Sequence, residues 1–353
     1  MTNMDDALDR APPPDRRPRL PAWISLTLRL AATAGLMALA LRGVEWPKLL
    51  DLFNTIDWRW WAAGFATAMV VQVIAAVRWA LLARPIGFPF SIGLFVWRFF
   101  EGAFFSLCLP TSIGGDVVKA WCAARWTQDK RAEAALTVVV DRLVGTLALL
   151  LFSVAMIPMA WEAAPGVPLF PGYRRYQLVA LLVGGMAAVA LGAVVVGFYT
   201  DLLAEGALAG RLLRRLPRGD SMARALAACR LFGRHPWYVM SAAFWSLVIN
   251  LAIVGTFLAL ADGLRLEVPA RVLWFVVPAV VCVAALPITP SGLGVREHLF
   301  VSLLAIAAFP GVKHGEALAL ALLGYSANLV WSAVGGIVYL AFPGRTSPGA
   351  VGG

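Results

Sequence analysis

Long apolar segments constrain this chain more than any other feature of its sequence. A helix that spans a bilayer needs about 20 mostly apolar residues. Of the 353 residues, 60% are hydrophobic and only 14% are charged, whereas soluble domains carry about 25% charged residues. This composition excludes a soluble enzyme, a nucleic-acid-binding domain and a secreted disulfide scaffold, and it predicts an all-α integral membrane protein. Six segments are long enough to span: Trp23–Leu41, Trp58–Leu82, Ala134–Met159, Tyr176–Phe198, Trp237–Leu260 and Ala317–Phe342.

Two further apolar segments are interrupted by proline and glycine. Ser91–Leu109 is followed by Pro110, and Val272–Leu286 is followed by Pro287 before the chain becomes apolar again at His298–Phe309. Paired breaks in corresponding halves of a chain are typical of inverted-repeat transporters, in which half-helix ends present free N–H and C=O groups to a polar ligand. The alternative is that proline and glycine mark two ordinary loops.

The distribution of lysine and arginine predicts the orientation. The arm 1–22, the segment 120–133 and the loop 200–235 are basic, and the positive-inside rule places all three in the cytoplasm. Two full spans precede Ser91 and return the chain to the cytoplasm. Because the segment 120–133 is also cytoplasmic, residues 91–118 must enter and leave the membrane on the cytoplasmic face. The same counting of spans predicts that residues 272–309 enter and leave on the outer face. The predicted fold therefore has six full transmembrane helices plus two re-entrant elements in an inverted-repeat-like arrangement, with both termini cytoplasmic.

The polar parts of the chain flank or interrupt this membrane domain. We expect a disordered basic arm at 1–22, a membrane domain at 23–342 and a short tail at 343–353. The loop 200–235 alternates arginine with apolar residues, as an interfacial helix on anionic lipid headgroups does, although it could serve only to fix the topology.

The sequence predicts no catalytic, metal or cofactor site. The histidines have no metal-ligand spacing, and no Walker A, G-x-S-x-G or G-x-G-x-x-G motif is present. No C-x-x-C occurs, so the four cysteines are expected to be small apolar residues: Cys108, Cys122, Cys229 and Cys282.

Charged residues inside apolar segments are costly and therefore indicate candidate functional positions. We expect Asp141 and Arg142 to find partners among the charges at the breaks, and Arg98 to pair with Glu101 one helical turn away. Arg78 lies near a span end, and we expect its guanidinium to extend to the interface. The candidate site comprises these charges and the residues of the breaks: Arg98, Glu101, Pro110, Thr111, Ser112, Gly114, Gly115, Asp116, Lys119, Asp141, Arg142, Pro287, Thr289, Ser291, Gly292, Gly294, Arg296 and Glu297.

Three motifs carry a family resemblance. LPTSIGGDVVKAW (Leu109–Trp121), DRLVG (Asp141–Gly145) and LPITPSGLGVRE (Leu286–Glu297) occur in this order. Together they resemble the flippase-like lysylphosphatidylglycerol synthase transmembrane-domain family, over roughly residues 23–342. Lys119 stands where many relatives have arginine, and Asp141 precedes Arg142 where glutamate is commoner.

The resemblance implies a function. In the multiple peptide resistance factors of this family, the membrane region is similar to a flippase for aminoacylated phosphatidylglycerol, and a separate cytosolic domain makes that lipid. Our chain ends at Gly353, so we expect the translocating part without the synthase, and hence no enzyme. Relatives linked to hopanoid or glycolipid pathways leave the lipid open.

We therefore expect a lipid translocase in a bacterial inner membrane. Asp116 and Glu297 would meet cationic parts of a phospholipid or glycolipid headgroup, and Lys119, Arg142 and Arg296 would meet phosphate. Two alternatives stay open: an accessory subunit of a lipid-modifying enzyme such as a glycosyltransferase, and a secondary transporter for a small solute, which would need a cavity closed to lipid. No nucleic-acid partner is expected, and homo-oligomerisation stays open.

Overall fold

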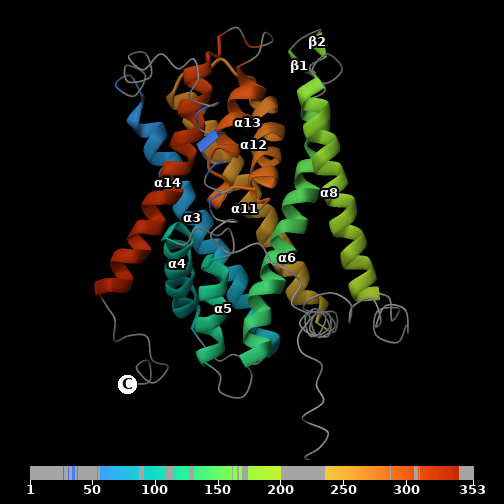
Figure 1. Cartoon of the computed structure of the whole chain (residues 1–353), viewed down its shortest axis with the longest axis vertical. Coiled ribbons are helices and arrows are strands. Elements are labelled where there is room, and N and C mark those ends of the chain that lie inside the picture. The colour runs from blue at the N-terminus through green and yellow to red at the C-terminus, as the bar shows by residue number, and fades with distance from the viewer. Residues whose placement is uncertain are drawn as a thin grey trace, which may run out of the picture.

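Five long helices form the body of the bundle in a computed structural model of the chain (Figure 1). They are α3 (Trp58–Ala83), α6 (Arg131–Ala155), α8 (Arg174–Tyr199), α11 (Pro236–Gly263) and α14 (His314–Ala341). The structure describes residues 56–86, 91–108, 114–126, 131–160, 162–164, 167–168, 174–199, 235–286, 288–305, 309 and 311–341, with single positions at 27, 31, 34, 35, 38 and 54.

These helices confirm five of the six predicted spans, because each is long and apolar enough to cross a membrane. The sixth, Trp23–Leu41, lies outside the described residues apart from single positions, as do the arm 1–22, almost all of the loop 200–235 and the tail 343–353. The chain is a multi-pass membrane protein. Local signals set the helix starts: the Asp57 carboxylate accepts a hydrogen bond from the Arg59 N–H at 3.0 Å and caps α3, and Pro236 occupies the first turn of α11.

Each predicted break separates two shorter helices. The first lies between α4 (Ile92–Cys108) and α5 (Gly114–Trp126). The second lies between α12 (Ala270–Ala284) and α13 (Val295–Leu304), with the 3₁₀ turn η4 (Pro290–Gly292) inside it. The helices α4 and α5 occupy one half of the height of the bundle, and α12 and α13 occupy the other half (Figure 1). The described helices therefore end and begin again on either side of each predicted break, one break in each half of the molecule.

Short elements complete the described chain. The 3₁₀ turns are η1 (Arg84–Ile86), which follows α3, and η2 (Ile157–Ala160), which follows α6. The strand β1 (Glu162–Ala164) pairs antiparallel with β2 (Val167–Pro168). This two-stranded ribbon lies at the end of α6 and α8 (Figure 1).

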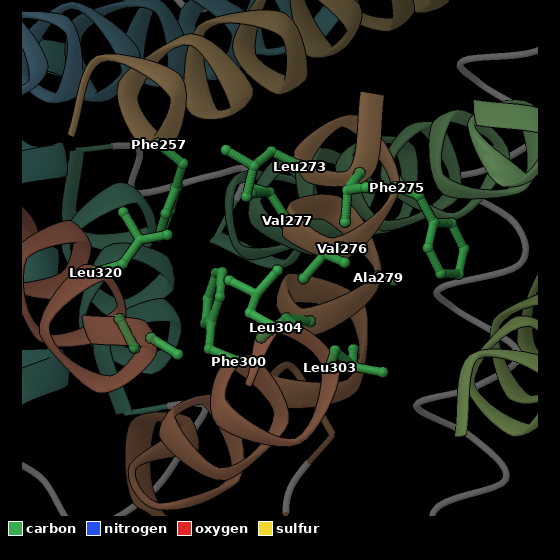
Figure 2. Close-up of a cluster of buried hydrophobic side chains, with 14 of the residues drawn as sticks. Phe257, Leu273, Phe275, Val276, Val277, Ala279, Phe300, Leu303, Leu304 and Leu320 are labelled. Carbon is green, nitrogen blue, oxygen red and sulfur yellow. The ribbon is translucent and has the colours of Figure 1, made fainter. Parts of the chain in front are cut away.

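The buried apolar side chains form two cores. The larger one joins α11, α12, α13 and α14, with Phe257, Phe275, Phe300 and Leu320 among its residues (Figure 2). The smaller one surrounds Trp79 of α3 and includes residues of α4, α5, α6 and α11. Each core packs around one pair of broken helices, so each half of the bundle has its own apolar centre.

The broken element α4 packs against α14 at two glycines. A Cβ added at Gly335 would overlap the backbone carbonyl of Phe100, and one at Gly336 would overlap the Phe104 ring. Backbones in membrane bundles approach this closely only where small residues occupy the crossing. The position of the first broken element therefore depends on these glycines.

We predict that Gly335→Ala lowers the free energy of unfolding by about 1–3 kcal/mol, the usual range for overpacking, because the overlap is with backbone and the helices must move apart. Gly255→Ala in α11 is the matched control, since nothing lies within 4 Å of its added Cβ. Thermal unfolding of the two purified variants in one detergent measures the difference. Equal unfolding midpoints would show that α4 and α14 do not need this close crossing.

Candidate functional site

A cluster of three charged residues lies beside the first break. Asp116 occupies the first turn of α5, where the helix dipole favours a carboxylate. Its Oδ2 lies 2.6 Å from Nε of Arg142 on α6, and its Oδ1 lies 3.9 Å from Nζ of Lys119. The Lys119 ammonium also lies over the Phe99 ring, 3.6 Å from the centroid. One carboxylate therefore lies between two cations and holds α5 against α6.

The two partners of Asp116 differ in accessibility. Lys119 is buried, whereas 57% of the Arg142 side chain is exposed. Guanidinium groups bind phosphate and carboxylate through two parallel hydrogen bonds. Arg142 is therefore the cation of this cluster that an outside anion can reach.

The Asp116–Arg142 pair forms the polar part of a cavity of about 530 Å³. Three lining residues, Val117, Val139 and Leu143, are also exposed on the outside of the bundle. Exposed apolar side chains of a membrane protein are the ones that lipid can contact, so we expect this side of the cavity to face the bilayer. The lining residues come from α5, α6, α8 and from α12 and its C-terminal end: Asp116, Val117, Ala120, Val138, Val139, Arg142, Leu143, Thr146, Leu149, Leu150, Met186, Cys282, Ala285 and Leu286.

The second break has an unusual backbone. Ser291, Gly292 and Gly294 have φ values of 53°, 71° and 83°, in the region that favours glycine. At Gly292 an added Cβ would lie 2.8 Å from the carbonyl oxygen of Ala284, so this turn folds back closely onto the end of α12. Thr289 is buried, and its hydroxyl has no hydrogen-bond partner among the described residues.

The start of α13 is held from inside the protein. Glu297 is fully buried, and its Oε2 accepts the Gly294 N–H at 2.7 Å. Its Oε1 accepts hydrogen bonds from Nε and Nη2 of Arg296 at 3.3 and 3.2 Å. The Arg296 guanidinium lies 3.8 Å from the centroid of the Tyr325 ring on α14. In the described structure Glu297 thus caps a helix and neutralises Arg296.

The second break contacts the described end of α4. The Ser291 hydroxyl of the second break donates a hydrogen bond to the Ser106 carbonyl, near the end of α4, at 3.4 Å. On the other side, α5 lies so close to α4 that a Cβ at Gly115 would overlap the Gly102 carbonyl and the Ser106 hydroxyl. Glycine at position 115 is therefore required by packing. Segments that are far apart in the sequence meet between the halves of the bundle.

The remaining charged candidates lie away from the cavity. Arg98 and Glu101 are buried in α4 and pair as predicted, with 2.5 Å between Nη1 and Oε2. The indole N–H of Trp97 donates to the other carboxylate oxygen at 2.9 Å. The two charges therefore neutralise each other within α4. Neither residue lines the cavity.

Two predicted environments were wrong. Arg78 does not extend to the interface but is buried and binds Asp141 through Nε and Nη2, at 2.8 and 3.1 Å from its two carboxylate oxygens. Asp141 consequently does not pair with a charge at the breaks, whereas Arg142 does. The physical reason is that α4, α6 and α11 all pack against α3, and a carboxylate on one of them neutralises Arg78. The sequence feature that could have predicted this pair is the presence of opposite charges, Arg78 and Asp141, in successive predicted spans.

Other predicted positions have a simpler outcome. Pro110, Thr111, Ser112 and Pro287 lie outside the described residues, and Gly114 begins α5. Cys122 and Cys282 are buried. Among the described residues, no group of three or more His, Cys, Asp or Glu side chains could hold a metal ion.

The family is decided by a match over most of the chain. A family model described as the lysylphosphatidylglycerol synthase TM region matches residues 26–336. The chain belongs to this family. Within this lysylphosphatidylglycerol synthase TM region lie both breaks, the Asp116–Arg142 pair and the cavity. The match is to the membrane region and not to a synthase domain. No curated protein matches the chain significantly.

We predict that Glu297→Gln lowers the free energy of unfolding by about 3 kcal/mol, because the amide can still accept the Gly294 N–H but leaves Arg296 without its counter-ion. Glu316→Gln is a matched control: Glu316 accepts the Lys313 N–H at 2.8 Å with the same spacing at the start of α14, where it is partly exposed. Thermal or denaturant unfolding of both variants gives the comparison. If the two substitutions cost the same, burial of the Arg296–Glu297 pair has no special role.

Proposed function

We propose that this protein moves a lipid with a polar headgroup between the leaflets of its membrane. The observation that carries the proposal is the cavity, which has an ion pair at one place, mostly apolar walls elsewhere, and exposed apolar side chains among its lining residues. A lipid has the same division, with a charged headgroup and apolar acyl chains. A lateral opening lets the chains remain in the bilayer while the headgroup enters the protein.

The ion pair suggests how the headgroup binds. Arg142 is the accessible cation and would bind the lipid phosphate through its guanidinium fork. Asp116, released from Arg142, would bind a cationic part of the headgroup such as the ammonium of an aminoacyl group. Lys119, 3.9 Å from Asp116, would hold that carboxylate in place. When a headgroup with both a phosphate and an ammonium binds, the Asp116–Arg142 pair is replaced by two ion pairs with the lipid.

The two breaks supply the means of movement in this proposal. Half-helices that end at mid-bundle can change their packing without breaking a continuous helix, as in transporters with inverted repeats. The hydrogen bond between Ser291 and Ser106 joins the two broken elements. A movement of one element would therefore displace the other. We propose that both elements are re-entrant, from opposite faces, with the N- and C-termini in the cytoplasm.

Family membership supports the lipid substrate. The family is linked to the flipping of aminoacyl-phospholipids, and we propose a lipid of this kind or a related phospholipid or glycolipid. A transporter for a small soluble solute is disfavoured, because its cavity would be polar and closed to lipid. An accessory subunit of a lipid-modifying enzyme would show no transport of its own, and the experiment below separates it from a translocase.

We predict that the purified protein in liposomes accelerates the flipping of fluorescent lysyl-phosphatidylglycerol, phosphatidylglycerol or both, measured by the loss of fluorescence on adding a membrane-impermeant quencher. Arg142→Gln should slow this flipping about tenfold or more, because a hydrogen bond to a charged group contributes about 1.5–3 kcal/mol. Asp116→Asn should slow the aminoacylated lipid more than the unmodified one.

Arg271→Gln is the control, since Arg271 is an exposed arginine of α12 that does not line the cavity. Its flipping rate should equal that of the unmodified protein. If liposomes with the unmodified protein flip neither lipid faster than empty liposomes, the translocase proposal is wrong and the accessory-subunit alternative gains.

A further inference from the structure

A buried cluster formed by Arg78, Asp141 and Ser246 joins α3, α6 and α11, and we did not predict this pairing from the sequence. We propose that Arg78 and Ser246, through Asp141, fix the rotation of α6 and thereby aim Arg142 into the cavity. Both are positioning residues, which act through another residue and do not touch the lipid. This inference rests on the proposed function, in which Arg142 binds the headgroup.

One face of α6 is bound to α3. Thr137, Asp141 and Gly145 are spaced by four residues and therefore lie on one side of the helix. The Trp79 indole N–H donates to the Thr137 hydroxyl at 3.0 Å, and the Arg78 guanidinium binds Asp141 through two hydrogen bonds. A neighbouring face of α6 lines the cavity with Val139, Arg142 and Thr146.

The geometry of an α-helix couples these two faces. Successive residues of an α-helix point about 100° apart. When Asp141 is bound to α3, Arg142 must therefore point to a different side, where Asp116 and the cavity lie. A rotation of α6 that releases Asp141 from Arg78 would turn Arg142 away from Asp116 by the same angle.

The guanidinium of Arg78 is itself fixed from a third helix. Its Nη1 donates to the Ser246 hydroxyl on α11 at 2.8 Å, and that hydroxyl donates to the Ala242 carbonyl at 2.7 Å. Arg78 thus uses all three of its nitrogens, two on Asp141 and one on Ser246. Lysine has one ammonium and no planar fork, so it could keep the charge but could not make this arrangement.

Gly145 leaves the space that the guanidinium occupies. A Cβ added at Gly145 would lie 2.8 Å from Nη1 and 2.9 Å from Nη2 of Arg78. These atoms are at the end of a flexible side chain, so Gly145→Ala would displace the guanidinium while leaving the helix intact. The substitution therefore disturbs the cluster without removing a charge.

The test measures the geometry directly and independently of transport. In the full-length protein with its four cysteines replaced, Asp116→Cys and Arg142→Cys introduce a thiol pair across the cavity wall. Dibromobimane becomes strongly fluorescent when it links two nearby thiols, so its fluorescence reports whether positions 116 and 142 face each other. Arg78→Lys, Ser246→Ala and Gly145→Ala are each combined with this pair. Gly184→Ala is the matched control, because nothing lies within 4 Å of its added Cβ.

We expect Arg78→Lys and Gly145→Ala to lower the linking yield at least about threefold, since neither retains the fork on Asp141. Ser246→Ala should lower the yield less, and Gly184→Ala should leave it unchanged. Thermal unfolding is recorded for every variant. If Arg78→Lys lowers the unfolding midpoint while the linking yield stays at the control value, Arg78 only stabilises the fold and the proposal is overturned.

Flipping assays on the same three substitutions, made without the introduced cysteines, separate this inference from the proposed function. The positioning role and the proposed function are both supported if a variant loses the linkage and also flips lipid more slowly. In that case we expect the half-saturating lipid concentration to change more than the maximal flipping rate. A variant that loses the linkage but flips lipid normally would keep the positioning role and contradict a role for Arg142 in transport.

Discussion

Charge neutralisation in a medium without water is the constraint on which the rest of this structure depends. A charge left alone inside a membrane bundle costs several kcal/mol, so each one must find a partner within the protein. The described part of the bundle meets this demand with four arginine–carboxylate pairs, and Lys119 shares the carboxylate of Asp116. The four pairs are Arg78–Asp141, Arg98–Glu101, Arg142–Asp116 and Arg296–Glu297. Two of the pairs join different helices and two lie within one helix.

The pairs differ in what they leave free. Arg98–Glu101 is closed by the Trp97 indole, and Arg296–Glu297 is closed by the Gly294 N–H and the Tyr325 ring. Asp116–Arg142 is the pair that borders the cavity and exposes more than half of a guanidinium side chain. An ion pair that stays accessible can exchange partners with a ligand. A buried ion pair with further contacts cannot do so without a large cost in free energy. This difference is why the proposed headgroup site is centred on Asp116 and Arg142.

The broken helices obey the same constraint through their backbones. Non-helical backbone at membrane depth needs partners inside the protein. The Gly294 N–H of the second break donates to the Glu297 carboxylate, and the Ser106 carbonyl near the end of α4 accepts a hydrogen bond from the Ser291 hydroxyl. Close packing at Gly115 and Gly292 brings each break against its own preceding helix. The second break is thus held both by its own helix α13 and by the end of α4.

The sequence by itself determined the five described spans, both interruptions and the family, because hydrophobic length, proline and glycine act locally and leave a readable pattern. It also determined that Arg98 pairs with Glu101, since their spacing places them on one helix face. Tertiary structure alone decided that Asp141 binds Arg78 while its neighbour Arg142 binds Asp116, and that Glu297 caps its own helix. It also decided where the cavity lies. Adjacent residues on a helix point about 100° apart, so their partners depend on which helices surround them. Hydropathy records that a helix is buried in a bundle but not how it is rotated, and this rotation determines which charge faces the cavity.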